Sequence, residues 1–284
     1  MKKTINLNNF RLKYPQYNHI PDDWFIWFIG FFEGDGCFTI GKKNVEIVIT
    51  QREDNKHVLD TMLENFKFGT VIVQTRHIVP GKLWTYKYIV RDFAGQNVLL
   101  NLFHDNLVIP IRQKKFNQFV LIYNQKLDRA KNNRPHKYKN INPIDSSTIL
   151  SWPMKIDTWI VGFIDAEGCF YTSIRENKVR MCFDICQKDY RDYSVLPLLE
   201  HIQKEIFNAG IISRHTHKSV ICLRVTGIRT EIQKVHDIFN ITSLKTNKLN
   251  NYLRQKEILF RYQQNHHLVE KSLREMIVIS NSRF

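Results

Sequence analysis

Two acidic residues, Asp35 and Glu167, each end an apolar segment and stand directly before a glycine. An acid is the unfavourable charge at the carboxyl end of a helix, so finding one there twice indicates a function rather than a solvated helix end. If the two segments pack together, the neighbouring carboxylates repel each other. Divalent cations relieve this repulsion, and oxygen ligands favour Mg²⁺ or a similar hard ion. Metal ions that bridge these carboxylates and a phosphate can activate water for in-line hydrolysis of a phosphodiester.

The sequence around these acids occurs twice. Residues 27–38 match residues 159–170 at an offset of 132, with six of twelve positions identical. Residues 49–53 match a later segment at an offset of 136, and Lys115 comes opposite Lys248 at an offset of 133. Three matches in the same order indicate a tandem duplication of a unit of about 130 residues.

Each unit has the pattern of a helix, two strands, a second helix, two more strands and closing helices. The first helix is expected to begin at an N-cap and to end at a glycine, with these candidates: Asp22, Asp23 or Asp157 at the start, and Gly36 or Gly168 at the end. The predicted strands cover residues 37–40, 45–50, 70–76, 83–90, 169–174, 179–186, 212–217 and 220–226. The later helices are predicted over residues 55–66, 93–103, 112–125, 194–207, 230–239 and 246–264. The fold class is therefore α+β, with two tandem αββαββα units, each an antiparallel four-stranded sheet packed under helices.

This pattern sets the expected domain organisation. An N-terminal arm without a clear core is followed by a first repeat, a basic linker rich in proline, a second repeat and a C-terminal tail with a short helix over residues 269–279. The boundaries are 1–20, 21–125, 126–152, 153–265 and 266–284.

Small residues recur on the first helix of each unit. Gly30 and Gly34 are four positions apart, and so are Gly162 and Ala166. Residues at this spacing lie on one helix face, and their small size allows two helix backbones to approach closely. We therefore expect one such helix from each repeat to pack against the other and bring the two acids together.

The composition favours a polyanionic partner. The chain has 284 residues, a net charge of +15 and 43% hydrophobic residues, which is ample for a core. A strongly basic, well-packed chain points to nucleic acid. No apolar run is long enough for a membrane span, and the first residues do not resemble a signal peptide, so neither membrane nor secreted proteins are favoured.

The five cysteines include no C-x-x-C pair, which disfavours a disulfide framework or a zinc ribbon and leaves reduced thiols as the expectation. Isoleucine, asparagine and lysine are frequent, but only four alanines occur. This usage is typical of an AT-rich gene. An organelle fits it, with the mitochondrion as our first expectation, the chloroplast as the second and an AT-rich bacterium as a further alternative.

Residues 28–36 and 160–168 resemble the nine-residue signature of the LAGLIDADG homing endonucleases, specifically the single-chain members with two motif copies. The resemblance covers residues 22–264. It implies a monomer whose two sheets form a pseudo-two-fold DNA-binding saddle and which cuts both strands of double-stranded DNA at a long site. Mg²⁺ or a similar divalent cation would be the cofactor. The metal ligands carried over are Asp35, Glu167, Gly34 and Ala166, the last two through backbone carbonyls.

The resemblance also implies roles for other residues. Gln51 and Gln187 would orient water near the metal, and Lys115 and Lys248 would steady the charge that grows on the phosphate. The alternatives are a polar strand end for each glutamine and a simple phosphate clamp for each lysine. The acids two positions before the metal ligands, Glu33 and Asp165, would be structural caps or hydrogen-bond partners.

Two departures from the family pattern matter. Ile29 and Val161 replace a usually small residue, so we expect a bulkier contact between the helices. Glu167 replaces aspartate and is one methylene longer than Asp35, so the two metal sites cannot be identical. Unequal cleavage rates of the two strands would follow.

The strands supply candidate DNA contacts. Val45, Ile47 and Ile49 alternate with other residues and belong under the helices. The opposite face of each sheet is polar and basic, and glutamine and arginine there can read base edges in the major groove. The alternative is a solvated sheet face. The candidates are Thr39, Lys43, Thr70, Gln74, Arg76, Thr85 and Lys87 in the first unit, and Tyr171, Ser173, Arg175, Arg180, Asp184, Ser213, His215, His217 and Arg224 in the second.

Rival functions remain open. An RNA-binding maturase that assists splicing of a host intron would use the same fold without needing the acids, and both activities could coexist. A DNA-binding regulator with an inactive nuclease fold would be expected to lose the motif acids, which are present here. An intein is disfavoured because no splicing block flanks the repeats.

Overall fold

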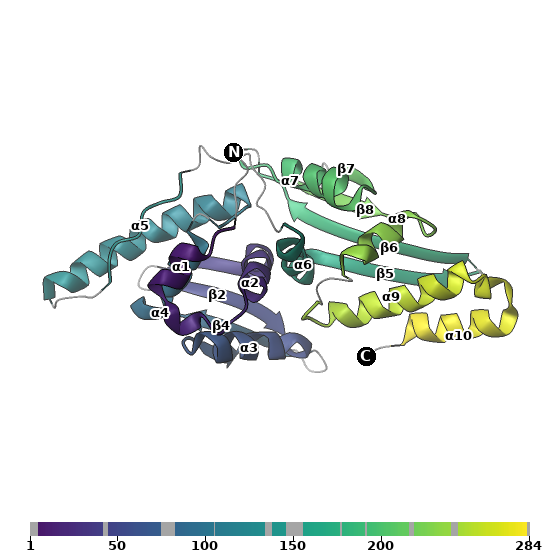
Figure 1. The fold of residues 1–284 in the computed structure, drawn as a ribbon, viewed down its shortest axis with the longest axis horizontal. Coiled ribbons are helices and arrows are strands. Elements are labelled where there is room, and N and C mark those ends of the chain that lie inside the picture. Colours follow the sequence, from purple (N-terminus) through teal and green to yellow (C-terminus); the bar gives the residue numbers. More distant parts are fainter. Residues whose placement is uncertain are drawn as a thin grey trace. The chain divides into compact units, whose positions relative to one another are not determined.

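The computed structural model describes residues 5–41, 45–74, 83–104, 106–133, 138–145, 156–176, 178–190, 192–215, 219–239 and 244–282. The chain divides into two compact units, Met1–Phe163 and Ile164–Phe284. Each unit contains a four-stranded antiparallel sheet with helices on one side (Figure 1). Within the described ranges, no helix combines the length and the apolar character needed to cross a membrane.

The first sheet has the strand order β1-β2-β4-β3. Its residues alternate between a buried face and an open one, and the expectation that Val45, Ile47 and Ile49 lie under the helices is confirmed, because all three are buried. The open face carries directly paired residues such as Thr50 and Lys87. The strands are β1 (Gly36–Ile40), β2 (Val45–Arg52), β3 (Thr70–Val73) and β4 (Thr85–Val90).

An aromatic core joins the first sheet to its helices. Phe32 of α2 stacks on Phe103 of α4 with ring centroids 4.2 Å apart, and Phe28 meets Phe66 of α3 at 5.0 Å. Helix α2 is buried on all sides from Phe25 onward, which explains why its apolar residues show no single stripe. The helices that pack here are α2 (Asp22–Asp35), α3 (Lys56–Phe66), α4 (Phe93–Phe103) and α5 (Pro110–Asn133).

The two motif helices, α2 and α6 (Ile156–Glu167), approach each other at the expected glycines. A Cβ atom at Gly30 would lie 2.1 Å from the carbonyl oxygen of Trp159, and one at Gly162 would lie 2.0 Å from that of Trp27. No larger side chain fits without moving a backbone. These contacts lie within the first unit, whose boundary with the second falls inside α6.

The start of α2 differs from the expected cap, whereas its end at Gly36 agrees with the expectation. Pro21 occupies the N-cap, and Asp22 and Asp23 lie in the first turn. Their charge still favours that end of the helix. Gly36 has a φ of −75° and begins β1 in extended conformation. Glycine is required there for space, because a Cβ would lie 2.2 Å from the Phe32 ring.

The second sheet has the order β5-β6-β8-β7 and repeats this plan. Phe170 meets Phe183 at 4.8 Å and Tyr252 of α9 at 5.6 Å, so an aromatic core again joins the sheet to its helices. The strands are β5 (Gly168–Arg175), β6 (Lys178–Lys188), β7 (Ile211–His215) and β8 (Val220–Val225). The helices are α7 (Leu196–His201), a π-helical continuation (Ile202–Phe207), α8 (Glu231–Ile238), α9 (Lys248–Gln263) and α10 (Glu270–Asn281).

Two expectations about the flanking segments are wrong. The N-terminal arm forms α1 (Asn8–Lys13) and a 3-10 turn, with Phe10 and Tyr17 buried and Phe10 packed edge-on against Phe25 at 5.2 Å. The start of the basic linker is helical, because α5 continues to Asn133. Further along, the backbone of Ile144 exchanges hydrogen bonds of 2.7 and 2.8 Å with the Asn117 side chain of α5. Both segments are therefore part of the first unit's packing.

One expectation about the cysteines is also wrong. Cys186 on β6 and Cys222 on β8 form a disulfide, whereas Cys37, Cys169 and Cys182 are free thiols. The two bonded residues stand directly opposite each other in the register of the second sheet. Spacing along the chain could not reveal this pairing, because the 36-residue separation is closed only by the strand order.

Candidate functional site

The first acid lies in a hydrogen-bonded group at the end of α2. The Gln51 side-chain amide donates a 2.5 Å hydrogen bond to the Asp35 carboxylate, and Gln51 in turn accepts from Asn55 at 3.1 Å. Gln51 is buried on β2, which fixes the direction of its amide. Two residues that the sequence analysis singled out separately are thus brought together.

Arg112, near the start of α5, holds the backbone beside this acid. Its guanidinium donates to the carbonyl oxygens of Glu33 at 2.6 Å, Gly34 at 2.5 Å and Gly36 at 2.6 Å. A planar guanidinium has five donors in a fixed geometry, which suits it to several carbonyls at once. The carbonyl of Gly34 is one of the two that are expected to bind metal, and the Arg112 guanidinium contacts it in this structure.

Glu33 holds α5 in place. Its buried carboxylate accepts hydrogen bonds from the backbone N–H groups of Val108 and Ile109 and from the Trp159 indole, at 2.6 to 3.0 Å. Burial raises the pKa of Glu33 to about 7, opposed by these donors and by Arg112. The expectation that Glu33 is a hydrogen-bond partner is confirmed.

The second unit has the same arrangement with a different cation. Asp165 accepts hydrogen bonds from the backbone of Lys245 at 2.7 Å and Thr246 at 3.0 Å, just before α9. Lys248, the first residue of α9, donates through Nζ to the carbonyl oxygens of Ala166 at 2.5 Å and Ile164 at 3.2 Å. Asp165 is therefore also confirmed as a hydrogen-bond partner. Lys248 contacts the carbonyl of Ala166, the residue that matches Gly34 in the second repeat.

Arg112 makes the contact with the Gly34 carbonyl that Lys248 makes with the Ala166 carbonyl, whereas the sequence alignment pairs Lys248 with Lys115. Phe38 packs on Phe116, whereas Phe170, which matches Phe38, packs on Tyr252. The contact with Phe116 gives the closing helices an offset of 136, whereas the contact of Phe38 with Phe119 at 5.4 Å gives the 133 of the sequence alignment. Arg112 falls opposite Lys248 at an offset of 136, and Lys115, one turn further along α5, does so at 133. Sequence reasoning missed Arg112 because it matched lysine to lysine.

The remaining predicted residues are placed on their own elements. Glu167 ends α6 and Gln187 lies near the end of β6, and both are half-buried. Within the described ranges, no cluster of three or more histidine, cysteine, aspartate or glutamate side chains could hold a metal by itself. Each helix end instead offers one carboxylate and one carbonyl oxygen, both hard ligands that suit Mg²⁺. The cations of Arg112 and Lys248 on these carbonyls indicate that positive charge is stabilised there.

The candidate DNA contacts lie on the open faces of the sheets wherever the structure describes them. Tyr171, Ser173, Arg180 and Asp184 are paired across β5 and β6 with residues of the same face, as the register requires. The other described members are Thr39, Thr70, Gln74, Thr85, Lys87, Arg175, Ser213 and Arg224. Lys43, Arg76 and His217 lie outside the described residues, as does the side chain of His215.

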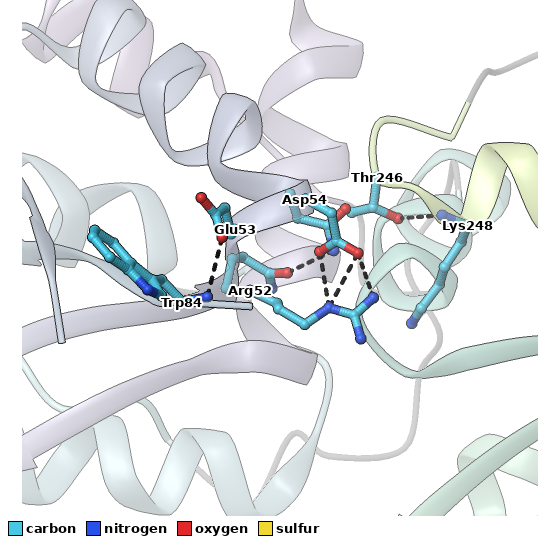
Figure 2. Close-up of polar contacts among 8 residues, drawn as sticks. Arg52, Glu53, Asp54, Trp84, Thr246 and Lys248 are labelled. Carbon is cyan, nitrogen blue, oxygen red and sulfur yellow. Dashed lines mark hydrogen bonds and ion pairs between the residues drawn. The ribbon is translucent and has the colours of Figure 1, made fainter. Parts of the chain in front are cut away.

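One residue of the open face of the first sheet was missed. Arg52 ends β2 on the open face of the first sheet, next to Gln51, and its guanidinium pairs with Asp54 (Figure 2). Beside this pair, Glu53 accepts a 3.2 Å hydrogen bond from the Trp84 backbone. Extending the alternation of β2 by two residues, through Thr50 to Arg52, would have found Arg52.

In the second sheet, Asp184 binds the side chain of Arg224 on the neighbouring strand. Arg224 donates two hydrogen bonds to Asp184, at 2.8 and 2.7 Å, and Cys182 donates a third at 3.0 Å. Burial alone would raise the pKa of Asp184, but these donors outweigh it and lower the pKa. Asp184 therefore fixes the position of the Arg224 guanidinium on the open face.

In this duplicated α+β fold, each motif-helix end has an acid, a carbonyl oxygen and a cation, and each unit has an open polar sheet face. These features define a class of two-repeat proteins suited to metal-dependent chemistry on a phosphodiester. The model of the LAGLIDADG endonuclease family matches residues 28–123 and 160–259, once in each repeat. The chain belongs to the LAGLIDADG endonuclease family.

Relatives and solved structures agree with this membership. "Probable intron-encoded endonuclease 4" of Neurospora crassa is 32% identical over 241 residues, which are 82% of this chain and 39% of that protein. "Probable intron-encoded endonuclease Cox1-I1b" of Schizosaccharomyces pombe is 24% identical over 211 residues, 65% of this chain and 50% of that protein. The chain thus spans half or less of the length of these relatives.

The fold matches that of homing endonucleases bound to DNA. The LAGLIDADG homing endonuclease I-GzeII in complex with its DNA target aligns with a TM-score of 0.72 and 18% identity, over 93% of this chain and 98% of that chain. I-LtrWI bound to target DNA aligns with a TM-score of 0.70 and 19% identity, over 93% and 98%. At these identities the likeness establishes the α+β fold with two four-stranded sheets.

Proposed function

We propose that this chain is a site-specific endonuclease that cuts both strands of double-stranded DNA at a long target site, with a divalent cation, Mg²⁺ in the first instance. One observation carries the proposal. At both motif-helix ends a carboxylate, Asp35 or Glu167, follows directly on a carbonyl that a cationic side chain contacts, at Gly34 and at Ala166. A duplicated pair of such ends suits a reaction that must be performed once on each strand.

The donor set fits a hard cation. Asp35 and the Gly34 carbonyl would hold one ion, and Glu167 and the Ala166 carbonyl the other, with water and phosphate oxygens as further ligands. Bound there, the metal would supply an activated water and stabilise the leaving oxygen.

The protein's own residues prepare this chemistry. Gln51 orients the Asp35 carboxylate through its amide. Arg112 and Lys248 hold the carbonyls in place and carry positive charge toward a phosphate, where they would stabilise charge that develops during hydrolysis. Gln187, on the strand equivalent to that of Gln51, would orient water in the second unit.

The open sheet faces would bind the DNA. Basic side chains there, such as Lys87, Arg180 and Arg224, would neutralise phosphates, and glutamine and arginine would read base edges in the major groove. The net charge of +15 supports this mode of binding. The proteins I-GzeII and I-LtrWI, which share the fold, are bound to DNA targets.

Three further features complete the proposal. The chain acts as a monomer, since its two repeats supply both helix ends. It resides in a mitochondrion, in keeping with an amino-acid composition typical of an AT-rich gene and with intron-encoded relatives from fungi. Intron RNA is a second candidate partner.

The experiment is a selection of cleaved duplexes from a randomised DNA library with purified protein and Mg²⁺. Recovery of one long consensus by the protein, and of none by its Asp35→Asn/Glu167→Gln variant, is the expected outcome. A random spectrum of cuts, or no cuts at all, contradicts the proposal. Repeating the binding with host-intron RNA as competitor tests the RNA partner.

A further inference from the structure

The open face of the second sheet contains a disulfide where the first sheet has a polar pair. Cys186 and Cys222 face each other on β6 and β8, in the register position that Thr50 and Lys87 occupy on β2 and β4. Among the described residues, the bonded pair belongs to the second sheet alone. The role of the disulfide must therefore lie in the second unit.

The surroundings place the disulfide in the middle of the candidate DNA surface. The neighbouring pair on one side is Asp184 with Arg224, and Ser213 of β7 stands opposite Cys222. Cys222 is 4% exposed, whereas Cys186 is half-buried. A small thiol can thus reach the Cys186 sulfur and displace the Cys222 thiolate.

The free thiols of this face do not disturb the disulfide. Burial and the Asp184 carboxylate raise the pKa of Cys182 to about 12, and burial also raises that of Cys169. Thiolates, and not thiols, attack disulfides, so these two cysteines stay inert at neutral pH. The bond is exposed to exchange with external thiols, and protected from exchange with its own neighbours.

We propose that Cys186 and Cys222 form a thiol–disulfide exchange site that sets the rigidity of the DNA-contacting face of the second unit, an inference that rests on the proposed function. A low-molecular-weight thiol of the glutathione class is the reductant. Two such thiols are oxidised to one disulfide, the Cys186–Cys222 bond breaks, and the two thiol protons end on the two protein sulfurs. Oxidised glutathione reverses the exchange.

The consequence follows from the position of the bond. Reduction removes the covalent link between β6 and β8 in the open face. The oxidised face is covalently tied between β6 and β8, and loses less conformational freedom on binding. The oxidised protein should therefore bind its target more tightly, while the residues of the helix ends are unaffected.

The first test counts thiols without DNA. The full-length protein is equilibrated with oxidised or reduced glutathione, denatured, and alkylated for intact-mass analysis. Three labels on the oxidised protein, at Cys37, Cys169 and Cys182, and five on the reduced protein support the site. Five labels in both states overturn it, whatever the outcome of the cleavage selection.

The second test measures target binding in EDTA, where no cleavage occurs. The oxidised protein should bind at least about threefold more tightly than the reduced one, by the preorganisation argument. Cys186→Ser/Cys222→Ser should bind like the reduced protein in both states, whereas the matched control Cys169→Ser/Cys182→Ser should keep the response. Equal affinities of the two wild-type states overturn the inference. If no duplex is cleaved in the selection, the proposed function is wrong. The thiol count still shows whether Cys186 and Cys222 form a disulfide.

Discussion

The side-chain amide of Gln51 donates a 2.5 Å hydrogen bond to the carboxylate of Asp35. This contact joins the second strand of the first sheet to the end of the motif helix, and it fixes the orientation of an acid that the sequence placed only at a helix end.

Replacement of the motif acids should abolish cleavage without abolishing binding. Asp35→Asn or Glu167→Gln removes a carboxylate ligand and leaves the sheet faces intact, so double-strand cleavage should fall by about 10³-fold or more while target affinity stays within about tenfold. Plasmid linearisation and gel-shift titration measure the two effects. Linearisation at the normal rate by either variant would show that the metal assignment is wrong.

Loss of the Gln51 amide should lower the rate more than the affinity. Gln51→Leu keeps the volume on β2 but leaves Asp35 without this orienting donor, and we expect cleavage about 10- to 100-fold slower with nearly unchanged binding. Gln74→Ala, on the open face of the same sheet, is the control and should weaken binding instead. Single-turnover rates and dissociation constants separate the two outcomes.

Arg112, rather than Lys115, should be needed for cleavage. Arg112→Ala leaves three backbone carbonyls without their donor, which should slow cleavage and lower the free energy of unfolding by about 1–3 kcal/mol. Lys115→Ala, one turn away on α5, should leave both quantities close to those of the wild type. Because only the first unit is altered, Arg112→Ala should accumulate nicked plasmid before linear DNA. The reverse result, with Lys115 essential and Arg112 dispensable, would support the alignment of Lys115 with Lys248 and contradict the role of Arg112.

Binding to the target should weaken steeply with salt. If the open faces neutralise six or more phosphates, affinity should drop by roughly 10³-fold or more between 50 and 200 mM salt. Fluorescence anisotropy in EDTA measures this slope. A nearly flat response would argue against docking through the sheet faces.

Acid should destabilise the second unit through His236. This buried side chain bonds to Gln255 at 2.9 Å, and Gln255 donates to the Tyr171 carbonyl under β5. Burial lowers the pKa of His236, so the unfolded chain takes up a proton near pH 6.5 that the folded protein does not. Stability should therefore fall as the pH drops below about 6.5 toward the lowered folded value. Melting temperatures at pH 7.5 and 5.5 should differ less in His236→Gln than in the wild type, and an equal difference would exclude this histidine as the cause.

The sequence by itself determined the duplication, the order of elements and the positions of the acids. Repeated segments such as residues 27–38 and 159–170 carry their own local signals: helical apolar residues, then alternation with a period of two. The spacing of Gly30 from Gly34, and of Gly162 from Ala166, also predicted close packing of the helices at these positions. Residues four positions apart share a helix face in any α-helix.

Only the tertiary structure decided which residues meet. Arg112 and Lys115 are both basic residues at the start of one helix, and the packing of α5 decides that Arg112 reaches the Gly34 carbonyl. The disulfide between Cys186 and Cys222 depends on β6 pairing with β8, a register that no local pattern encodes. The packed arm around Phe10 likewise depends on a partner, Phe25, that lies in another element. Local propensity fixes elements, whereas contacts between elements arise from long-range packing and hydrogen bonding, which a single sequence does not specify pair by pair.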